Sequence, residues 1–335
     1  MKFCVLVRMY NDEPYINYFI SHYLNLGFNK IVILNSSDNG YINQNPNVEI
    51  HKVYKTKAWM KHTPNEIINL LKRDYDWVFV VDTDEFLILH KKYKTILDYV
   101  EEKLKINSNI NVFRFRWLMI EKIDNEELSF NQIIKNYKSY LNYNVKSLTK
   151  TNELISFTDH FPLLKSKPLV FLENKCTNIL TTPISAELNK FLEYQTYVES
   201  ALIHISTRNL DDLILKSLVT NFPKKKIPSI IDLKKIISKP DNLNLENLKK
   251  VIGIKFIIPF KFTNNFSNNT TILSEEKFNI PDINVEFVNK SYADEILKKV
   301  LKENDIDFEE YKIFIDKLGK EINKNFNIKR NTKEI

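Results

Sequence analysis

Residues 77–86 read WVFVVDTDEF, and this stretch decides the fold of the chain around it. Its first five residues are apolar and form the continuous run that is typical of a strand buried on both faces of a parallel sheet. Asp82, Asp84 and Glu85 follow directly. Acidic side chains at the end of a buried strand are costly unless a positive group lies nearby. The stretch therefore predicts a buried strand with a binding site for a positive group at its carboxyl end.

The spacing of the two aspartates indicates what that site binds. In an extended chain, side chains two residues apart point to the same side, so Asp82 and Asp84 can face one cation together. Ligands of open α/β sheets bind outside the carboxyl ends of the strands, where this pair lies. Two carboxylates with room for water and phosphate oxygens suit Mg²⁺ or Mn²⁺. The alternative is a polar loop that caps the next segment, although a cap needs only one carboxylate.

Strand and helix patterns alternate on both sides of this stretch. We expect strands at 3–7, 31–34, 48–53, 77–81 and 111–117, and helices that begin at 11–14, at the capping box 63–66 and at 95. The first helix is expected to stop at Gly27. This order predicts an α/β fold with a mostly parallel central sheet and helices on both faces.

The pattern weakens beyond residue 120, and residues 205–335 contain no His, Trp or Cys. Side chains that carry out polar chemistry are therefore concentrated in the first two thirds of the chain. We expect one domain at 1–220 and a lysine-rich, mainly helical C-terminal extension at 221–335.

Composition excludes several classes of protein. Four glycines cannot supply a dinucleotide-binding fingerprint or a phosphate-binding P-loop. Cys4 and Cys176 are far apart, so no disulfide framework and no thiolate zinc site is expected. The apolar start is too short for a signal peptide, and no run approaches the roughly 18 to 20 apolar residues of a spanning helix. We expect a cytoplasmic protein.

The positive charge is concentrated in one segment. Net charge is +7, and residues 216–261 hold eleven lysines and three acidic residues, a net charge of +8. Lysine clusters that alternate with isoleucine and leucine suit peripheral contact with an acidic membrane or a lipid-linked substrate. The alternative is a solvated helix face.

Four segments together resemble a known family: RMYNDEPYINYFISHYLNLGFNKIVILNSSDNG at 8–40, DYDWVFVVDTDEFLIL at 74–89, VKSLTKTNELISFTDHFP at 145–162 and LIHISTRNLDDLILKSL at 202–218. They resemble GT-A-fold glycosyltransferases, in particular a family-2-like group with a D-x-D-E-F motif. The resemblance implies a GT-A-like domain with a nucleotide-sugar half at about 1–120 and an acceptor half at about 121–220.

The resemblance also implies roles for individual residues. Those expected to border the nucleotide are Arg8, Asn11, Glu13, Asp38 and Asp82. Asp82 and Asp84 would hold the ribose and the metal-diphosphate, with Mn²⁺ or Mg²⁺ as the metal. His204 would be a third metal ligand, although a histidine in an apolar strand is also typical of a core residue.

The acceptor half offers candidates for acceptor binding and catalysis. Trp117 could stack on an acceptor sugar or pack in the core, and His160 is a second acceptor-binding candidate. An inverting transfer needs a group that takes the proton of the acceptor hydroxyl. Asp159 is the first candidate for this base, and Glu199 is the second.

The predicted function is transfer of a sugar from a UDP- or GDP-sugar to a hydroxyl of a glycan or lipid-linked acceptor, with metal dependence and inversion. Two alternatives remain at this point. One is a haloacid-dehalogenase-like phosphatase with Asp82 as nucleophile, although such sequences continue with Gly-Thr rather than Glu85-Phe86. The other is a basic nucleic-acid-binding protein, but here the aromatic residues are not interleaved with the lysines, so we expect no nucleic-acid partner.

Overall fold

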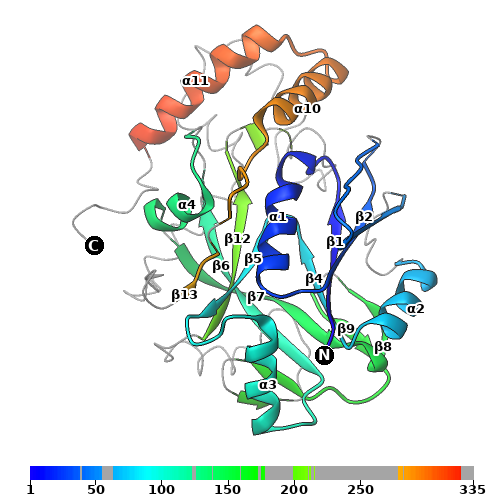
Figure 1. Cartoon of the computed structure of the whole chain (residues 1–335). Helices are drawn as coiled ribbons and strands as arrows, with labels where there is room; N and C mark the ends of the chain where they lie inside the picture. The colour runs from blue at the N-terminus through cyan, green and yellow to red at the C-terminus, as the bar shows by residue number, and fades with distance from the viewer. Residues whose placement is uncertain are drawn as a thin grey trace. The chain divides into compact units, whose positions relative to one another are not determined.

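The computed structural model in Figure 1 describes residues 1–37, 40–54, 63–122, 126–137, 139–158, 160–172, 175–177, 199–209, 211–212, 215, 278–281 and 283–325. The chain divides into two compact units. Unit 1 comprises Met1–Met119, Tyr140–His204 and Ile272–Val288, and unit 2 comprises Ile120–Ser139, Ile205–Thr271 and Asn289–Ile335. The expected domain boundary after residue 220 lies outside the described residues and stays a prediction.

A parallel half-sheet forms the start of unit 1. It contains β1 (Phe3–Met9), β2 (Lys30–Asn35), β3 (Val48–Lys52) and β4 (Trp77–Asp82) in the order β4-β1-β2-β3. All three pairings are parallel, and Arg8 of β1 lies opposite Asp82 of β4. β1 and β4 are almost wholly buried, as the continuous apolar runs predict. The carboxyl ends of these strands therefore meet at one edge.

The sheet continues through strands of mixed direction (Figure 1). They are β5 (Glu85–His90), β6 (Val112–Glu121), β7 (Ser139–Lys150), β10 (Val170–Leu172), β11 (Lys175–Thr177), β12 (Ser200–Thr207) and β13 (Phe278–Asn279). The strand order is β13-β5-β12-β6-β7-β4-β1-β2-β3, with β10 paired to β6 and β11 to β10. A separate pair is formed by β8 (Leu154–Phe157) and β9 (Pro162–Leu164).

The predicted α/β class with a central, mostly parallel sheet is confirmed, and antiparallel pairs extend it. β5 pairs antiparallel with β12 and β13, and β4 pairs antiparallel with β7. β5 was not predicted from the sequence. Only two residues separate it from β4, so the apolar runs WVFVV and FLIL look like a single apolar segment interrupted by acidic residues. β5 brings β12 beside those two residues.

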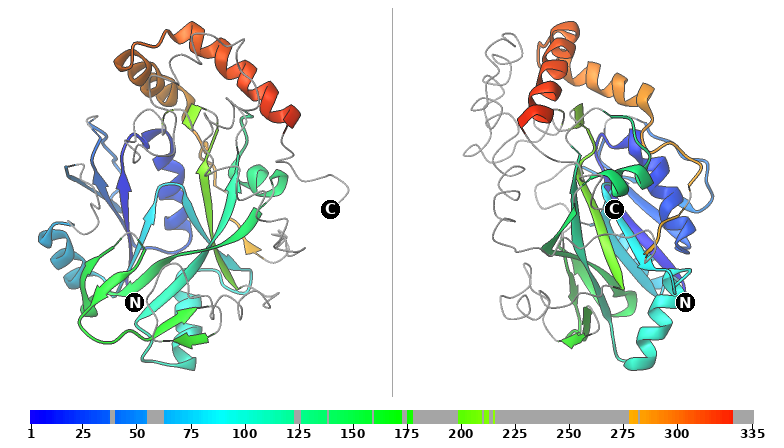
Figure 2. Two further views of the ribbon diagram at one scale, coloured as in Figure 1. Left: turned by 180° about the vertical axis from the view of Figure 1, so that it is seen from behind. Right: turned by 90° about the vertical axis from the view of Figure 1, so that its left-hand side faces the viewer.

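Helices flank the sheet of unit 1, as the views in Figure 2 show. They are α1 (Glu13–Asn25), α2 (Asn65–Asp74) and α3 (Ile96–Ile106), with a 3₁₀ turn at Thr151–Glu153. The expected capping box at the start of α2 does not form, because Pro64 is the N-cap and no side chain accepts a cap hydrogen bond. At α3, by contrast, Thr95 and Asp98 form a capping box.

Unit 2 contains α4 (Phe130–Asn136), α10 (Lys290–Glu303) and α11 (Phe308–Asn325). The last two confirm that the C-terminal region carries helices. Within this unit the buried Tyr311 of α11 donates a hydrogen bond of 2.7 Å to Asp211 Oδ1. This bond ties α11 to the segment that follows β12.

Helix α1 is fixed against the start of β5. Tyr23 donates its hydroxyl to the carbonyl of Glu85 at 2.9 Å and accepts the N–H of Leu87 at 3.3 Å. His22 Nε2 lies 2.8 Å from the Leu87 carbonyl. Burial lowers the pKa of His22 to about 4, so its ring is neutral at physiological pH. Two consecutive residues of α1 thus hold the backbone that follows Asp84.

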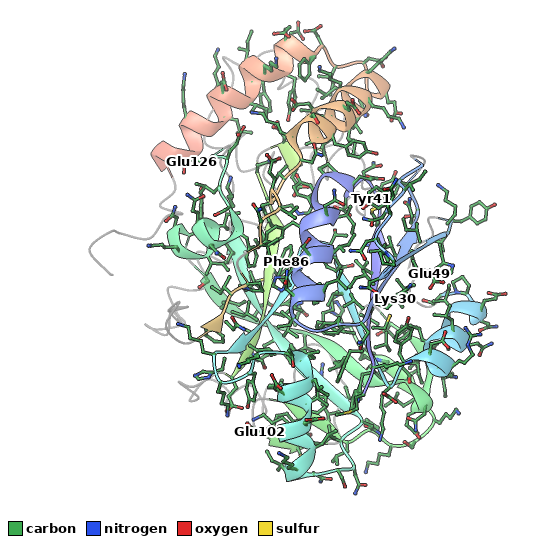
Figure 3. The ribbon with its side chains drawn as sticks, in the orientation of Figure 1. Lys30, Tyr41, Glu49, Phe86, Glu102 and Glu126 are labelled. Atoms are coloured by element: carbon green, nitrogen blue, oxygen red, sulfur yellow. The ribbon has the colours of Figure 1, made fainter. Side chains whose placement is uncertain are left out.

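An aromatic cluster fills the space between α1 and β5. Phe86, labelled in Figure 3, is fully buried and contacts the rings of Tyr18, Phe19 and Phe287. Phe287 lies within 5.1 Å of Tyr18, measured between ring centroids. The segment 278–288 therefore completes the core of unit 1 although it is distant in sequence.

Gly27 ends α1, as predicted. Its φ is +92°, its N–H donates to the Leu24 carbonyl, and the N–H of Phe28 donates to the Tyr23 carbonyl, the two bonds of a Schellman motif. A Cβ at this position would lie 3.0 Å from Cβ of Thr95. Both the conformation and the close approach require glycine.

We expect Gly27→Ala to lower the free energy of unfolding by about 1 kcal/mol or more, because alanine is strained at positive φ. Gly40→Ala is the matched control, since a Cβ there meets nothing within 4 Å. Urea denaturation of both variants measures the difference. Equal stability of the two variants would contradict this account of the helix end.

Candidate functional site

The loops that follow β1 and β2 are joined to each other at the edge where the parallel strands end. Asn11 adopts a left-handed conformation with φ of 56°, and its N–H donates to Ser37 Oγ at 2.8 Å. Ser37 in turn donates its N–H to Asn35 Oδ1 at 2.8 Å. Non-glycine residues in this conformation cluster at functional sites. Arg8, Asn11 and Asp82 thus lie along the same edge.

The other two residues expected near the nucleotide have different outcomes. Glu13 is the first residue of α1, and its side chain is buried. Asp38 lies outside the described residues, so its role stays a prediction.

Asp82 is paired with a lysine that the sequence analysis did not single out. Nζ of Lys146, on β7, donates to Asp82 Oδ2 at 2.8 Å. The lysine side chain is 3% exposed and the aspartate 39%. Burial opposes ionisation of Asp82, but attraction to Lys146 and Arg8 outweighs it, so the pKa lies below its ordinary value. Asp82 is therefore a carboxylate.

Glu85 is the third acid of the motif and points into the protein. Its side chain is fully buried, Oε2 accepts the N–H of Asp82 at 2.9 Å, and the same oxygen lies 3.6 Å from Lys146 Nζ. Burial raises the pKa of Glu85 well above its ordinary value, and the charges of Asp82 and Asp84 act in the same direction. Glu85 is thus a structural acid that holds the turn.

Asp84 faces His204 across the start of β5. The register of the antiparallel pair places His204 of β12 opposite Glu85. Asp84 Oδ1 and His204 Nε2 are 3.5 Å apart, and the two side chains are 14% and 13% exposed. His204 is therefore not simply a core residue, because one ring nitrogen is directed at the motif.

Aromatic side chains continue from His204 along the sheet. The ring centroids of Trp117 and His204 are 4.3 Å apart, and those of Trp117 and His160 are 5.4 Å apart. His160 is fixed by a contact of 3.2 Å between its Nδ1 and the Val145 carbonyl. The structure thus brings together the metal candidates and both acceptor-binding candidates. Asp159, the first candidate base, lies outside the described residues.

Two of the three predicted metal ligands have a suitable arrangement. Two ligand atoms at right angles around one Mn²⁺ or Mg²⁺, each about 2.1 Å from it, would be about 3 Å apart. The 3.5 Å between Asp84 and His204 fits that arrangement, whereas one oxygen of Asp82 is held by Lys146. Within the described part of the chain, no group of three or more His, Cys, Asp or Glu side chains could hold a metal ion.

The structure does not bring Glu199 to this site. It precedes β12 and lies beside the last residue of β5, whereas His204 pairs with the first, and its backbone carbonyl accepts the N–H of His90. Its carboxylate pairs with Lys103 and Lys92 and accepts a hydrogen bond of 3.1 Å from Tyr93. Burial opposes its ionisation, but the two lysines lower its pKa. We therefore assign Glu199 a structural role rather than that of a base.

The chain matches the model of glycosyltransferase family 92 over residues 4–245. It belongs to that family. The coarser prediction, a glycosyltransferase, is confirmed by this match, and the narrower resemblance to a family-2-like group with a D-x-D-E-F motif stays a prediction. This membership also favours a glycosyltransferase over the phosphatase and nucleic-acid-binding alternatives.

No curated protein sequence matches this family 92 glycosyltransferase. A solved structure of TarS from S. aureus, residues 1–349, is similar with 12% identity over 97% of this chain and 92% of that chain, at a TM-score of 0.27. The same TarS fragment in complex with UDP-GlcNAc has 11% identity over 85% and 98% of the two chains, also at 0.27. Such TM-scores carry no argument about function.

Sequence reasoning missed Lys146, although one signal was available. Lys146 begins the K-S pair in the segment VKSLTKTNELISFTDHFP, which is one of the four segments that resemble glycosyltransferases. Three carboxylates beside a buried strand required a cation, but nothing in the sequence indicates which of 49 lysines and arginines supplies it.

We expect Glu199→Gln to lower the free energy of unfolding by about 2 kcal/mol or more, because the buried Lys103 loses its carboxylate partner Glu199. Glu102→Gln is the matched control: Glu102 contacts the same two lysines but is 45% exposed. Its loss should cost less than about 1 kcal/mol. Because the folded state lowers the pKa of Glu199, this stabilisation is present above the unfolded-state pKa and is lost as pH falls through the folded-state pKa.

Denaturation at pH 7 and at pH 3 checks both the size and the pH dependence of this effect. If Glu199→Gln were as stable as wild type yet without transfer activity, the catalytic interpretation of Glu199 would be restored.

Proposed function

We propose that this family 92 glycosyltransferase transfers a sugar from a nucleoside-diphosphate sugar, such as a UDP- or GDP-sugar, to a hydroxyl group of a glycan or lipid-linked acceptor, in a GT-A-like site. The observation that carries the proposal is the pair Asp84 and His204, which face each other at 3.5 Å beside the carboxyl end of β4. Ligands of open α/β sheets bind at such strand ends.

Each residue at the carboxyl ends of the parallel strands would have its own role in donor binding. Asp82 would accept hydrogen bonds from ribose hydroxyls, since its carboxylate is charged and partly exposed. Arg8 and Asn11 would border the nucleotide. Asp84 and His204 would hold Mn²⁺ or Mg²⁺, which would neutralise the charge that develops on the diphosphate leaving group.

The acceptor would bind beside the aromatic side chains that adjoin His204. Trp117 offers an indole face next to His204, and His160 lies next to Trp117. Sugar rings pack against such faces. Asp159 adjoins His160 in the sequence and is our proposed base for an inverting transfer, in which it would take the proton of the acceptor hydroxyl.

Contact with a membrane is a separate part of the proposal. No helix in the described ranges is long and apolar enough to cross a bilayer. The lysine-rich segment 216–261 lies outside those ranges, so its peripheral contact with an acidic membrane stays a proposal based on its charge.

Asp84→Asn should lower kcat by about 100-fold or more, since it removes a charged ligand that acts on the leaving group. Asp74→Asn is the control, because Asp74 is paired with the exposed Arg73 at the end of α2. The assay measures release of nucleoside diphosphate from a panel of UDP- and GDP-sugars with and without EDTA. Full activity in EDTA would contradict the proposed dependence on a divalent metal.

His204→Ala should weaken binding of Mn²⁺-UDP about 10- to 100-fold if the imidazole is a ligand. Calorimetric titration measures the affinity, and His51→Ala serves as the control because His51 contacts Glu49 on β3 and its side chain is 30% exposed. Unchanged affinity with a lower melting temperature would make His204 a packing residue.

A further inference from the structure

Ser37 is a buried residue that joins the carboxyl ends of three parallel strands. It follows β2, and its exposed fraction is 0%. Its Oγ accepts the N–H of Asn11, which follows β1, at 2.8 Å. Its own N–H donates to Asn35 Oδ1 at 2.8 Å, and its carbonyl accepts Nζ of Lys52, the last residue of β3. All three polar groups of Ser37 are thus used to connect these strand ends.

The contact with Ser37 fixes an unusual backbone conformation. Asn11 has a φ of 56°, and left-handed backbone is unfavourable for a residue with a Cβ, although asparagine tolerates it better than most. Such a conformation persists where the surrounding contacts determine it. Ser37 supplies one of these contacts and is itself held by Asn35 and Lys52. The shape of the loop after β1 therefore depends on a residue that follows β2.

This loop lies where the proposed function places the nucleotide. It follows Arg8, which lies opposite Asp82 of β4, and it ends at Asp12, the N-cap of α1. A rotation about the backbone of Asn11 would move Tyr10 relative to Asp12 and redirect the chain as it enters the helix. A fixed φ at this position keeps the binding edge in one shape before the ligand arrives, which lowers the cost of binding.

We propose that Ser37 is a positioning residue for donor binding, which acts through the left-handed backbone of Asn11. This inference rests on the proposed function, because it concerns the nucleotide side of the same site. Because Ser37 is fully buried, it acts through Asn11 rather than by contact with the donor. The nucleoside has the same contacts before and during sugar transfer, so loss of the positioning bond should weaken donor binding and leave the chemical step unchanged.

Two substitutions separate the hydrogen bond from packing. Ser37→Ala removes the acceptor and leaves a small gap, whereas Ser37→Cys fills the same space with sulfur, a weak acceptor. Both should raise KM for the nucleotide sugar about tenfold and leave kcat within about twofold of wild type. Calorimetric titration with UDP and with GDP, each with Mn²⁺ and without acceptor, should show the same loss. A loss in Ser37→Ala alone would indicate packing and overturn the proposal.

Ser36→Ala is the matched control, since it makes the same change in the neighbouring residue. Ser36 Oγ donates to the Met9 carbonyl at 3.2 Å, and that carbonyl also accepts the Ser36 N–H at 2.9 Å. The contact between the loops therefore survives the substitution. Nucleotide affinity and KM of this variant should stay within about twofold of wild type.

Asn11→Gly tests whether Ser37 acts through this backbone. Glycine adopts positive φ without a steric penalty. In the Asn11→Gly background, the loss of nucleotide affinity caused by Ser37→Cys should therefore fall from about tenfold to about threefold or less. An undiminished tenfold loss would overturn the proposal, as would unchanged nucleotide affinity in both Ser37 variants.

Amide hydrogen exchange reports on the bond without any ligand. The Asn11 N–H should exchange about tenfold or more faster in Ser37→Cys than in wild type. Faster exchange with unchanged affinity for UDP and GDP would make Ser37 purely structural. Circular dichroism shows which variants fold, and Ser37→Cys decides if Ser37→Ala does not fold. Failure of the proposed function is distinguishable, because wild type itself would then bind neither nucleotide and turn over no nucleotide sugar.

Discussion

The site depends on how the protein compensates three carboxylates at the end of a buried strand. Each of the three acidic side chains has a different partner: Asp82 is paired with Lys146, Glu85 is buried and accepts a backbone N–H, and Asp84 faces His204. Two of these partners lie on strands that are distant in sequence, since Lys146 belongs to β7 and His204 to β12. The acidic turn therefore determines which strands must lie beside β4 and β5.

The parallel half of the sheet could be predicted from the sequence because its signals are local. Continuous apolar runs mark β1 and β4, and Gly27 marks the end of α1. Asp84 and His204 could also be predicted as candidate metal ligands, Asp84 from its spacing to Asp82 and His204 from the resemblance to glycosyltransferases. The resemblance to glycosyltransferases led to the correct class of enzyme, and the match to family 92 supports it independently.

Other features could not be predicted because they depend on pairing between distant strands. The Lys146–Asp82 pair requires β7 to lie beside β4, a pairing that no periodicity in either segment encodes. Glu199 was selected because it precedes the histidine strand, yet antiparallel pairing with β5 places it at the other end, next to Lys103. The direction of a strand, rather than its composition, places His204 beside Asp84 and Glu199 beside Lys103.

The return of the chain to unit 1 after residue 271 limits how this protein can be shortened. β13 covers an edge of β5, and Phe287 packs against Tyr18 and Phe86. A chain cut at residue 245, where the family match ends, would expose an unpaired strand edge and leave a hollow beside α1. Open edges of this kind favour aggregation. Unit 1 therefore cannot be truncated at residue 245 without loss of part of its sheet and core. Any shortened version of it must retain the segment 278–288.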